Sequence, residues 1–297
     1  MAFYSCVMNQ IKVTILRPSG NDTALVEGIP ERSQDKKKIN DFVMFKYPNV
    51  EQVGFYDLEN KRLEMAGREF CANAARAFAW VLSTKLGMKD FVLNVSGIKE
   101  PILAKVSSSN KVYIQFPVKR KTTFIKQLSK DLYEIRLEGI QILINTNEKS
   151  FKQDKKQITQ DALRLLDKYG LRTQYKASGI MYIKQANAKN FVLKPIVWVR
   201  DIETLFYETA CGSGSVALGF LQSFLLKKEV AIKVKQPSGR SIDIKIIHKN
   251  SDSMCAQISG EVKILDSKTL GNYSYYRGKP QSILSKPRVI KFVSKFE

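Results

Sequence analysis

The chain has 297 residues, and its 49 lysines and arginines against 28 aspartates and glutamates give a net charge of +21. This length fits one large domain or two of ordinary size, and the 44% hydrophobic content argues against a disordered chain. No apolar run approaches the ~18 residues needed to cross a bilayer, and the first residues lack the pattern of a signal peptide. We therefore expect a cytoplasmic protein without a membrane partner.

The positive charge raises the hypothesis of nucleic-acid binding. Specific nucleic-acid-binding proteins concentrate their charge on one element, whereas the lysines of this chain are spread along its length. The densest groups lie at 36–38, 119–121, 155–156 and in the tail after Arg277. This distribution favours a basic, solvated surface, and we expect no nucleic-acid partner. A basic nucleic-acid-binding protein remains the alternative from another functional class.

The cysteine and histidine content limits the chemistry. The four cysteines are Cys6, Cys71, Cys211 and Cys255, and the single histidine is His248. One histidine argues against a histidine-based metal site and against a Ser-His-Asp triad. The absence of a Cys-x-x-Cys pair argues against zinc ribbons and thioredoxin-like motifs. We expect no metal, and the chemistry is left to cysteine, carboxylate, lysine, tyrosine or backbone groups.

An internal repeat organises the chain. Each copy contains two apolar strands, a cysteine followed by an apolar helix, a hairpin and a closing strand. In the first copy these segments are 53–58, 63–67, 71–82, 91–106 and 111–117, and in the second 190–199, 203–208, 211–221, 230–246 and 254–260. The two cysteines are 140 residues apart, which is too long a period for a solenoid. The repeat predicts an α+β fold of two duplicated domains, each a strongly curved sheet around one helix.

Three further segments complete the prediction. Residues 119–130 are expected to form a linker, and residues 161–171 a surface helix that ends at a glycine. The apolar–basic alternation near the C-terminus, at 289–296, suits an edge strand. We assign 1–118 plus 267–297 to the N-terminal domain and 119–266 to the C-terminal domain.

Both repeated cysteines stand immediately before a helix. The positive end of the helix dipole stabilises a thiolate there, so we expect the pKa of each thiol to fall toward neutrality. The small residues that follow, 72–74 and 212–214, leave backbone N–H groups available to an anion such as a carboxylate. Two such sites that face each other across a cleft place one base on each side of a substrate's α-carbon. This arrangement predicts stereochemical inversion by Cys71 and Cys211, whereas Cys6 and Cys255 are interpreted as inert.

These motifs resemble the diaminopimelate epimerase-like superfamily of cofactor-independent racemases and epimerases, over nearly the whole chain. The matching segments are 18–22 (PSGND), 51–54 (EQVG), 71–76 (CANAAR), 208–214 (ETACGSG) and 236–239 (QPSG). The resemblance implies two pseudo-symmetric β-barrel-like domains, each around a central helix, with the active site in the cleft between them. It also implies catalysis without pyridoxal phosphate or any other cofactor.

The resemblance assigns roles residue by residue. It implies that Cys71 and Cys211 are catalytic. It implies that the substrate is bound by Asn21, Gln52, Ala72, Asn73, Glu208, Gly212 and Ser213. The expected partner is a small amino-acid substrate, and a homodimer is one expected assembly.

Within the superfamily, the chain is most similar to the histidine racemases of staphylopine-type metallophore pathways. That branch has a Pro-Ser-Gly-Asn segment, as at 18–21, and a Ser-Gly-x-Glu-Phe-Cys-Gly-Asn-Ala segment that resembles 66–74. The arginine that would pair with the distal carboxylate of diaminopimelate is absent from 201–209. We therefore expect L-histidine as substrate. Its side chain would face Glu203 or Glu208 and stack on a neighbouring aromatic ring.

Other activities stay open at this stage. Diaminopimelate or another amino acid is the alternative substrate within the superfamily. A degenerate, non-catalytic binding protein is a further alternative.

Overall fold

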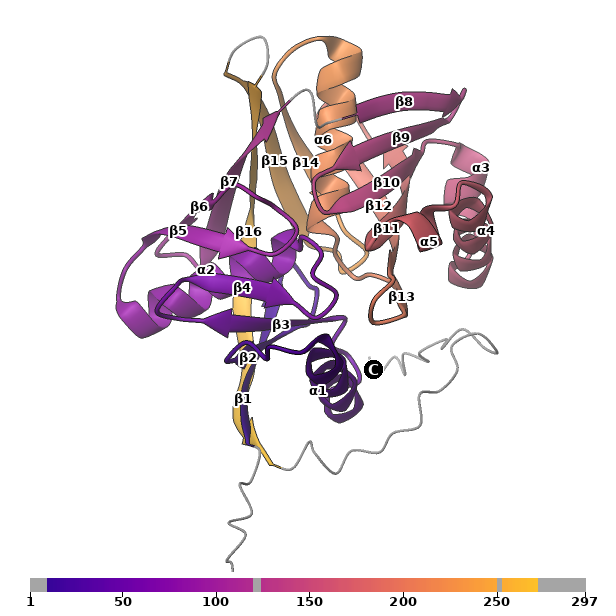
Figure 1. Cartoon of the computed structure of the whole chain (residues 1–297). Helices are drawn as coiled ribbons and strands as arrows, with labels where there is room; N and C mark the ends of the chain where they lie inside the picture. The colour runs from indigo at the N-terminus through magenta and orange to yellow at the C-terminus, as the bar shows by residue number, and fades with distance from the viewer. Residues whose placement is uncertain (1–9, 120–123, 250–252, 272–297) are drawn as a thin grey trace, which may run out of the picture.

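The computed structural model describes residues 10–119, 124–249 and 253–271 (Figure 1). Cys6, the basic tail after Arg277 and the edge strand predicted at 289–296 lie outside these residues. The described residues form a mixed α+β fold, as the sequence predicts. The helices are α1 (Ser33–Lys46), α2 (Ala72–Leu86), α3 (Glu148–Lys152), α4 (Lys155–Lys168), α5 (Leu171–Gln174) and α6 (Gly212–Leu226).

The strands are numbered in chain order. The first eight are β1 (Ile11–Pro18), β2 (Thr23–Glu27), β3 (Gln52–Asp57), β4 (Arg62–Met65), β5 (Asp90–Val95), β6 (Ile102–Val106), β7 (Lys111–Lys119) and β8 (Phe124–Ser129). The remaining strands are β9 (Leu132–Leu137), β10 (Ile140–Asn145), β11 (Ala177–Gln185), β12 (Asn190–Val199), β13 (Thr204–Tyr207), β14 (Val230–Lys235), β15 (Ser241–His248) and β16 (Ser253–Leu270).

The first group of strands closes around helix α2. Strands β1 to β7 are paired in sequence order, β7 pairs with β16, and β16 pairs with β1, which completes a ring of eight strands. Helix α2 contacts every strand of this ring. Its alanines allow this close approach because they add little volume, and Phe78 on the same helix is fully buried. The helix ends at Gly87, whose left-handed backbone (φ +69°) suits a glycine.

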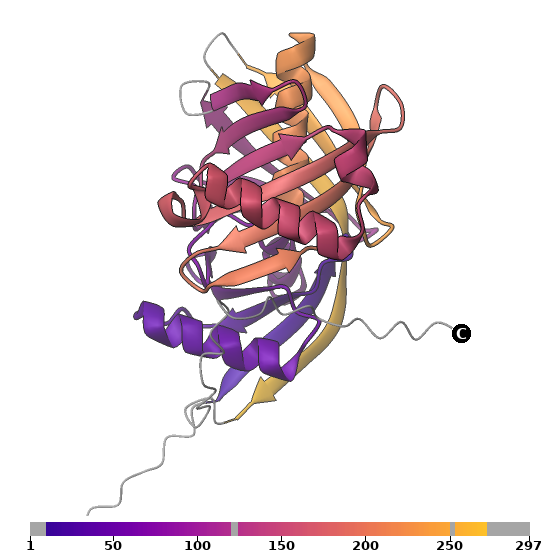
Figure 2. The same ribbon diagram turned by 90° about the vertical axis from the view of Figure 1, so that its right-hand side faces the viewer.

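The second group of strands surrounds helix α6. Its order continues from β16 through β15, β14, β12, β11, β10 and β9 to β8, and β13 pairs with β12. Helix α6 contacts β9, β10, β11, β14, β15 and β16 among these strands. Figure 2 shows α4 on the outside of this group, where Ile158, Ala162 and Leu166 are buried in a small separate core.

Strand β16 belongs to both groups. Its residues 253–261 pair with β7, and residues 254–259 also pair with β15. Its remaining residues, 262–270, pair with β1. One strand of 18 residues therefore connects the two groups through backbone hydrogen bonds.

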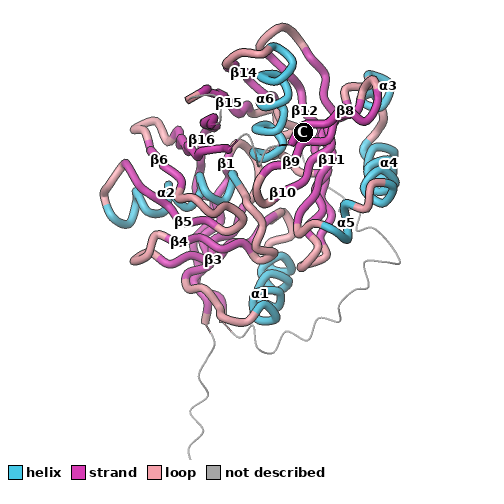
Figure 3. Tube along the Cα trace, turned by 45° about the horizontal axis from the view of Figure 1, so that its top comes forward, coloured by secondary structure: helices cyan, strands magenta, loops and turns pink. Residues whose placement is uncertain are grey.

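Helices α2 and α6 meet near their N-termini, inside the strands that surround them (Figure 3). A Cβ atom at Gly212 would lie 2.8 Å from the Ala72 Cβ and 3.1 Å from the Asn73 Oδ1. A larger side chain at position 212 would thus push the helices apart. The glycine at the start of α6 and the alanine at the start of α2 are the residues that allow this contact.

Most predicted elements of the repeat are confirmed. The strand pairs, the two helices after the cysteines and both hairpins have the predicted order, and α4 covers most of the helix predicted at 161–171. The linker predicted at 119–130 is wrong in part, because β8 occupies 124–129 and pairs with β9. Helices α1, α3 and α5 and strands β1, β2 and β8 to β11 were not predicted. No helix within 10–119, 124–249 or 253–271 is long and apolar enough to cross a bilayer.

The burial of α2 makes a testable prediction about stability. Phe78→Ala removes a fully buried ring that lies 5.5 Å from the Tyr56 ring, centroid to centroid. We expect the free energy of unfolding to fall by about 3–5 kcal/mol, as measured by urea denaturation. Leu103→Ala is the control, because Leu103 is 53% exposed, and it should cost less than about 1 kcal/mol. Equal losses for the two variants would contradict the central position of α2.

Candidate active site

Cys71 and Cys211 occupy matching positions at the starts of α2 and α6. Each is the N-cap residue of its helix, and their backbone angles are almost the same: φ −124° and ψ 106° for Cys71, φ −125° and ψ 105° for Cys211. The Ala74 N–H donates to the Cys71 Sγ over 3.3 Å, and the Gly214 N–H donates to the Cys211 Sγ over 3.4 Å. Each sulfur therefore satisfies a backbone donor that the first turn of a helix leaves without a partner.

A small internal cavity of about 30 Å³ contains both cysteines in its wall. Six of the other predicted site residues also line it: Gln52, Ala72, Asn73, Glu208, Gly212 and Ser213. The other side of the wall is largely apolar and comes from β10, β11, β12 and the segment leading into β13. The cavity has room for about one water molecule, so the site is closed in this conformation.

Asn21, the remaining predicted residue, lies next to the cavity rather than in its wall. Its Nδ2 donates to the Glu51 carboxylate and, over 3.2 Å, to the Ala210 carbonyl oxygen. The Asn73 Nδ2 donates to the same carbonyl over 2.8 Å. Asn21 and Asn73 thus hold the residue that precedes Cys211.

A chain of hydrogen bonds leads from the Cys71 thiol to Glu208, which lies beside Cys211. The Cys71 Sγ donates to the Gln52 Oε1 over 2.6 Å, and the Gln52 Nε2 donates to the Glu208 Oε1 over 2.9 Å. The Glu208 carboxylate lies close enough to Cys211 to raise the pKa of its thiol. Gln52 and Glu208 therefore occupy the region between the two sulfurs.

The pKa values of the thiols differ from the prediction. Burial raises the pKa of Cys71 and of Cys211 well above the ordinary value, and the Glu208 carboxylate raises both further. The N–H groups of the helices lower these pKa values, but their effect is smaller than the cost of desolvation. The expectation that the pKa falls toward neutrality is thus wrong for this closed cavity. The helix dipole alone does not make these thiols acidic.

Two buried carboxyl groups in the cavity wall have an oxygen without a partner. Burial raises the pKa of Glu208 to about 7 and that of Glu69 to about 7. The Oε2 atom of each is buried and has no hydrogen-bond partner. Glu69 was not singled out from the sequence, although a carboxylate two residues before the first cysteine in an otherwise apolar surrounding could have marked it. These two oxygens are acceptors that a bound ligand can satisfy.

Glu51 is a second residue that sequence reasoning did not assign. Its carboxylate accepts from Asn21 and from the Thr209 hydroxyl (2.7 Å) and backbone N–H (3.1 Å). These bonds fix the segment between β13 and α6 to the start of β3. Burial, followed by the nearby Glu208 carboxylate, raises the pKa of Glu51.

Arg76 places a positive charge beneath Cys71. Its side chain is fully buried and donates to the Ser19 hydroxyl over 2.9 Å and to the Asn73 Oδ1 over 2.7 Å. Within the described part of the chain its guanidinium pairs with no carboxylate. Burial lowers its pKa to about 10, which leaves it protonated at neutral pH. Arg76 thus stabilises negative charge on the Cys71 sulfur.

Glu203, one of the two carboxylates expected near a histidine side chain, is exposed and does not line the cavity. Among the described residues, no group of three or more histidine, cysteine, aspartate or glutamate side chains is arranged to hold a metal ion.

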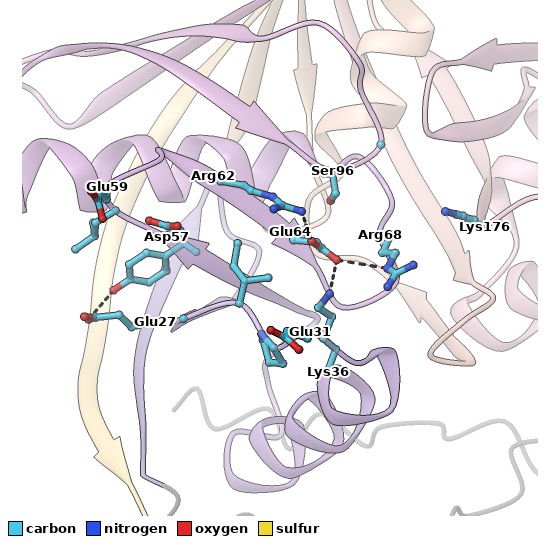
Figure 4. A pocket seen from close by; sticks show the side chains of 16 residues that line it. Glu27, Glu31, Lys36, Asp57, Glu59, Arg62, Glu64, Arg68, Ser96 and Lys176 are labelled. Atoms are coloured by element: carbon cyan, nitrogen blue, oxygen red, sulfur yellow. Dashed lines mark hydrogen bonds and ion pairs between the residues drawn. The ribbon is translucent and has the colours of Figure 1, made fainter.

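A larger, open hollow of about 880 Å³ lies on the outer side of β3 and β4 (Figure 4). There the Glu64 carboxylate accepts from Lys36 and lies 2.9 Å from the Arg62 Nη2 and 3.4 Å from the Arg68 Nε. Neither Cys71 nor Cys211 lines this hollow. The predicted site residues gather instead in and around the small cavity between the helix starts.

Comparisons with known proteins give the class of this protein. A protein-family model described as "Histidine racemase CntK N-terminal domain" matches residues 10–269. The histidine racemase of Fusobacterium nucleatum is 31% identical over 245 residues, which cover 78% of this chain and 88% of that protein. The histidine racemase of Staphylococcus aureus is 25% identical over 244 residues, which cover 77% and 86%.

A solved structure shares the fold at much lower sequence identity. The crystal structure of a hydroxyproline epimerase from Agrobacterium vitis aligns with a TM-score of 0.62 at 9% identity, covering 91% of this chain and 94% of that one. The fold and the relatives define the protein as an isomerase of the amino-acid racemase and epimerase class. The chain belongs to the histidine racemase family. The family resemblance found in the sequence is thereby confirmed.

The raised pKa values of the thiols predict slow alkylation. Both thiols stay protonated at a pH at which free cysteine begins to ionise. At pH 8.5 iodoacetamide should therefore alkylate Cys71 and Cys211 at least about 10-fold more slowly than it alkylates glutathione. Peptide-resolved mass spectrometry of the ligand-free protein measures the rates. Alkylation as fast as that of glutathione would show that the thiols are exposed or acidic, contrary to the closed site.

Proposed function

We propose that this protein interconverts L- and D-histidine by two-base proton transfer, with Cys71 and Cys211 as the bases and no cofactor. The observation that carries the proposal is the pair of sulfurs in the wall of one cavity, each at the start of a helix. The histidine racemase relatives support the substrate. A substrate α-carbon between the two helix starts would present one face to each sulfur.

The substrate carboxylate would bind at the two helix starts. The first N–H groups of a helix have no acceptor within the helix and carry partial positive charge. Ala72, Asn73, Gly212 and Ser213 line the cavity at these positions. Their N–H groups would stabilise the negative charge that spreads onto the carboxylate when the α-proton leaves.

One cysteine would remove a proton from the α-carbon, and the other would supply one. One cysteine, as thiolate, takes the α-proton, and the electron pair stays on the α-carbon and its carboxylate. The other cysteine, as thiol, gives its proton to the opposite face of the same carbon. The configuration of the α-carbon inverts, and the two cysteines exchange protonation states. The enzyme is then in the form that catalyses the reverse reaction.

A cationic substrate would also help to ionise the thiols. The Glu208 and Glu69 carboxylates raise the pKa of Cys71, after burial as the main cause. The substrate's α-ammonium group, placed against Glu208, would offset this negative charge. The thiols would then become acidic in the complex rather than in the empty protein.

We propose that the site lies in a cleft between two pseudo-symmetric domains, 1–118 plus 267–297 and 119–266. The closure of one group of strands around α2 and the packing of the other around α6 support this division. The cavity of about 30 Å³ does not accommodate an amino acid, so the domains would have to part for the substrate to bind. A cytoplasmic location and a homodimer remain predictions.

Replacement of either cysteine tests the two-base proposal. Cys71→Ser and Cys211→Ser should each reduce racemisation of L-histidine about 10²–10⁴-fold, because a hydroxyl is a far weaker acid than a thiol and scarcely forms the anion that would accept the α-proton. Chiral chromatography of the product measures the rates. Cys255→Ala is the control, since Cys255 lies in β16 outside the cavity wall, and it should retain near wild-type activity.

Near wild-type turnover in either serine variant would contradict the two-base assignment. A wild-type protein that racemises another amino acid but not histidine would overturn the substrate and leave the assignment of the cysteines standing.

A further inference from the structure

The two thiols and the helix starts account for the chemistry at the α-carbon but leave Glu69 without a role. Glu69 is 7% exposed, it lines the same cavity as the cysteines, and its Oε2 atom has no hydrogen-bond partner. A buried, unpaired carboxyl oxygen costs free energy in the empty protein, so its position calls for a partner that arrives with a ligand.

The surroundings of Glu69 fix the carboxyl group in place. A Cβ atom on Gly67 would lie 2.7 Å from the Glu69 Oε2 and 2.3 Å from the Val199 Cγ1, so only a glycine at position 67 leaves room for this arrangement. The Ser96 hydroxyl donates to the Glu69 carbonyl oxygen over 2.8 Å. The carboxyl group therefore lies between the segment that leads into α2 and the end of β12.

The two unpaired carboxyl oxygens of the cavity lie in different surroundings. Glu208 accepts from Gln52 and lies next to Cys211, so it lies beside the position proposed for the α-carbon. The Glu69 carboxyl group instead shares the space beside Gly67 with Val199, which lines the cavity together with Val197 and Phe206. A substrate whose α-ammonium group lies next to Glu208 would thus point its side chain toward a mostly apolar wall that contains one carboxyl group.

We propose that Glu69 binds the side chain of the substrate and selects a flat ring that carries an N–H group, an imidazole. This inference rests on the proposed racemase function and adds the residue that sets its specificity. The apolar wall accommodates the ring carbons, and the carboxyl group of Glu69 accepts a hydrogen bond from a ring nitrogen.

The combined charge of Glu69 and the bound ring suits an imidazole in particular. Burial, together with the Glu208 and Asp201 carboxylates that face it, raises the pKa of Glu69 to about 7, although the backbone N–H groups of Glu69 and Gly67 lower it. Cys71 is the other titratable group close to it. A free imidazole has a pKa of about 6.5, so at neutral pH Glu69 and the ring would share one proton and the pair would stay neutral overall. A neutral pair avoids the cost of a lone buried charge.

Two ligands of matched shape test this inference. L-Histidine and 3-(2-thienyl)-L-alanine have five-membered rings of similar size, but the thiophene ring has no N–H group. Inhibition of the wild-type protein by the thienyl compound gives its Ki, and histidine turnover gives KM and kcat. In Glu69→Gln we expect KM for histidine to rise about 10- to 100-fold, with a smaller change in kcat and a Ki for the thienyl compound within about 2-fold of wild type.

Glu203→Gln is the matched control, because Glu203 is a nearby exposed carboxylate outside the cavity wall. The KM of the Glu203→Gln variant for histidine should equal that of the wild type. Glu69→Asp keeps the charge and should recover part of the loss seen in Glu69→Gln. An unchanged Ki for the thienyl compound in Glu69→Gln would also show that the cavity is intact in that variant.

Three results separate this inference from the proposed function. An unchanged KM for histidine in Glu69→Gln would overturn the role of Glu69 and leave the racemase activity standing. An equal rise in the KM for histidine and the Ki for the thienyl compound would also overturn it, because Glu69 would then only support the shape of the cavity. A wild-type protein without histidine racemisation would contradict the proposed function itself.

Discussion

The contact between the N-termini of α2 and α6 is the constraint on which the site depends. Gly212 against Ala72 allows the two helices to approach, and Asn21 and Asn73 hold the Ala210 carbonyl between them. The same contact brings Cys71 and Cys211 to one cavity from positions 140 residues apart. The first group of strands closes around α2 and the second packs against α6, and the first turns of the two helices meet where the groups join. Strand β16 then connects the two groups of strands without interrupting the backbone pairing.

Burial of the site has opposite consequences for the empty protein and for the proposed complex. In the empty protein it raises the pKa of both thiols and of the Glu69 and Glu208 carboxyl groups, so at neutral pH the thiols stay protonated and the two carboxyl groups are only partly ionised. A ligand with N–H donors would satisfy the two free carboxyl oxygens and offset their charge. In this account the substrate completes the electrostatics of the site, which would limit proton abstraction to ligands that supply these donors. Arg76, beneath Cys71, is the fixed positive charge that the empty protein already has.

The sequence predicted the parts of the structure that leave a local signal. A cysteine before small residues and an apolar stretch predicted both central helices, and apolar strands around glycine turns predicted the hairpins. Helix α1 was not predicted because its sequence is rich in charged residues. Its N-cap residue, Arg32, also makes no side-chain hydrogen bond that would mark the start of the helix. Strand β8 lies in a lysine-rich segment typical of a linker and is a strand because it pairs with β9. The roles of Glu51 and Glu69 could not be predicted because they depend on Thr209 and Val199, which are distant in sequence. The raised pKa of the thiols depends on burial, which no local sequence pattern indicates.

If two different groups act on opposite faces of the α-carbon, the isotope content of the first product molecules will show it. The protein is incubated with L-histidine in D₂O, the enantiomers are separated at low conversion, and the α-hydrogen of each is measured by mass spectrometry. The account predicts D-histidine that is almost fully α-deuterated, because the proton comes from the second, solvent-exchanged thiol, while the remaining L-histidine still contains protium. D-Histidine that retains the original α-protium would show that a single group removes and returns the proton, and would contradict the account.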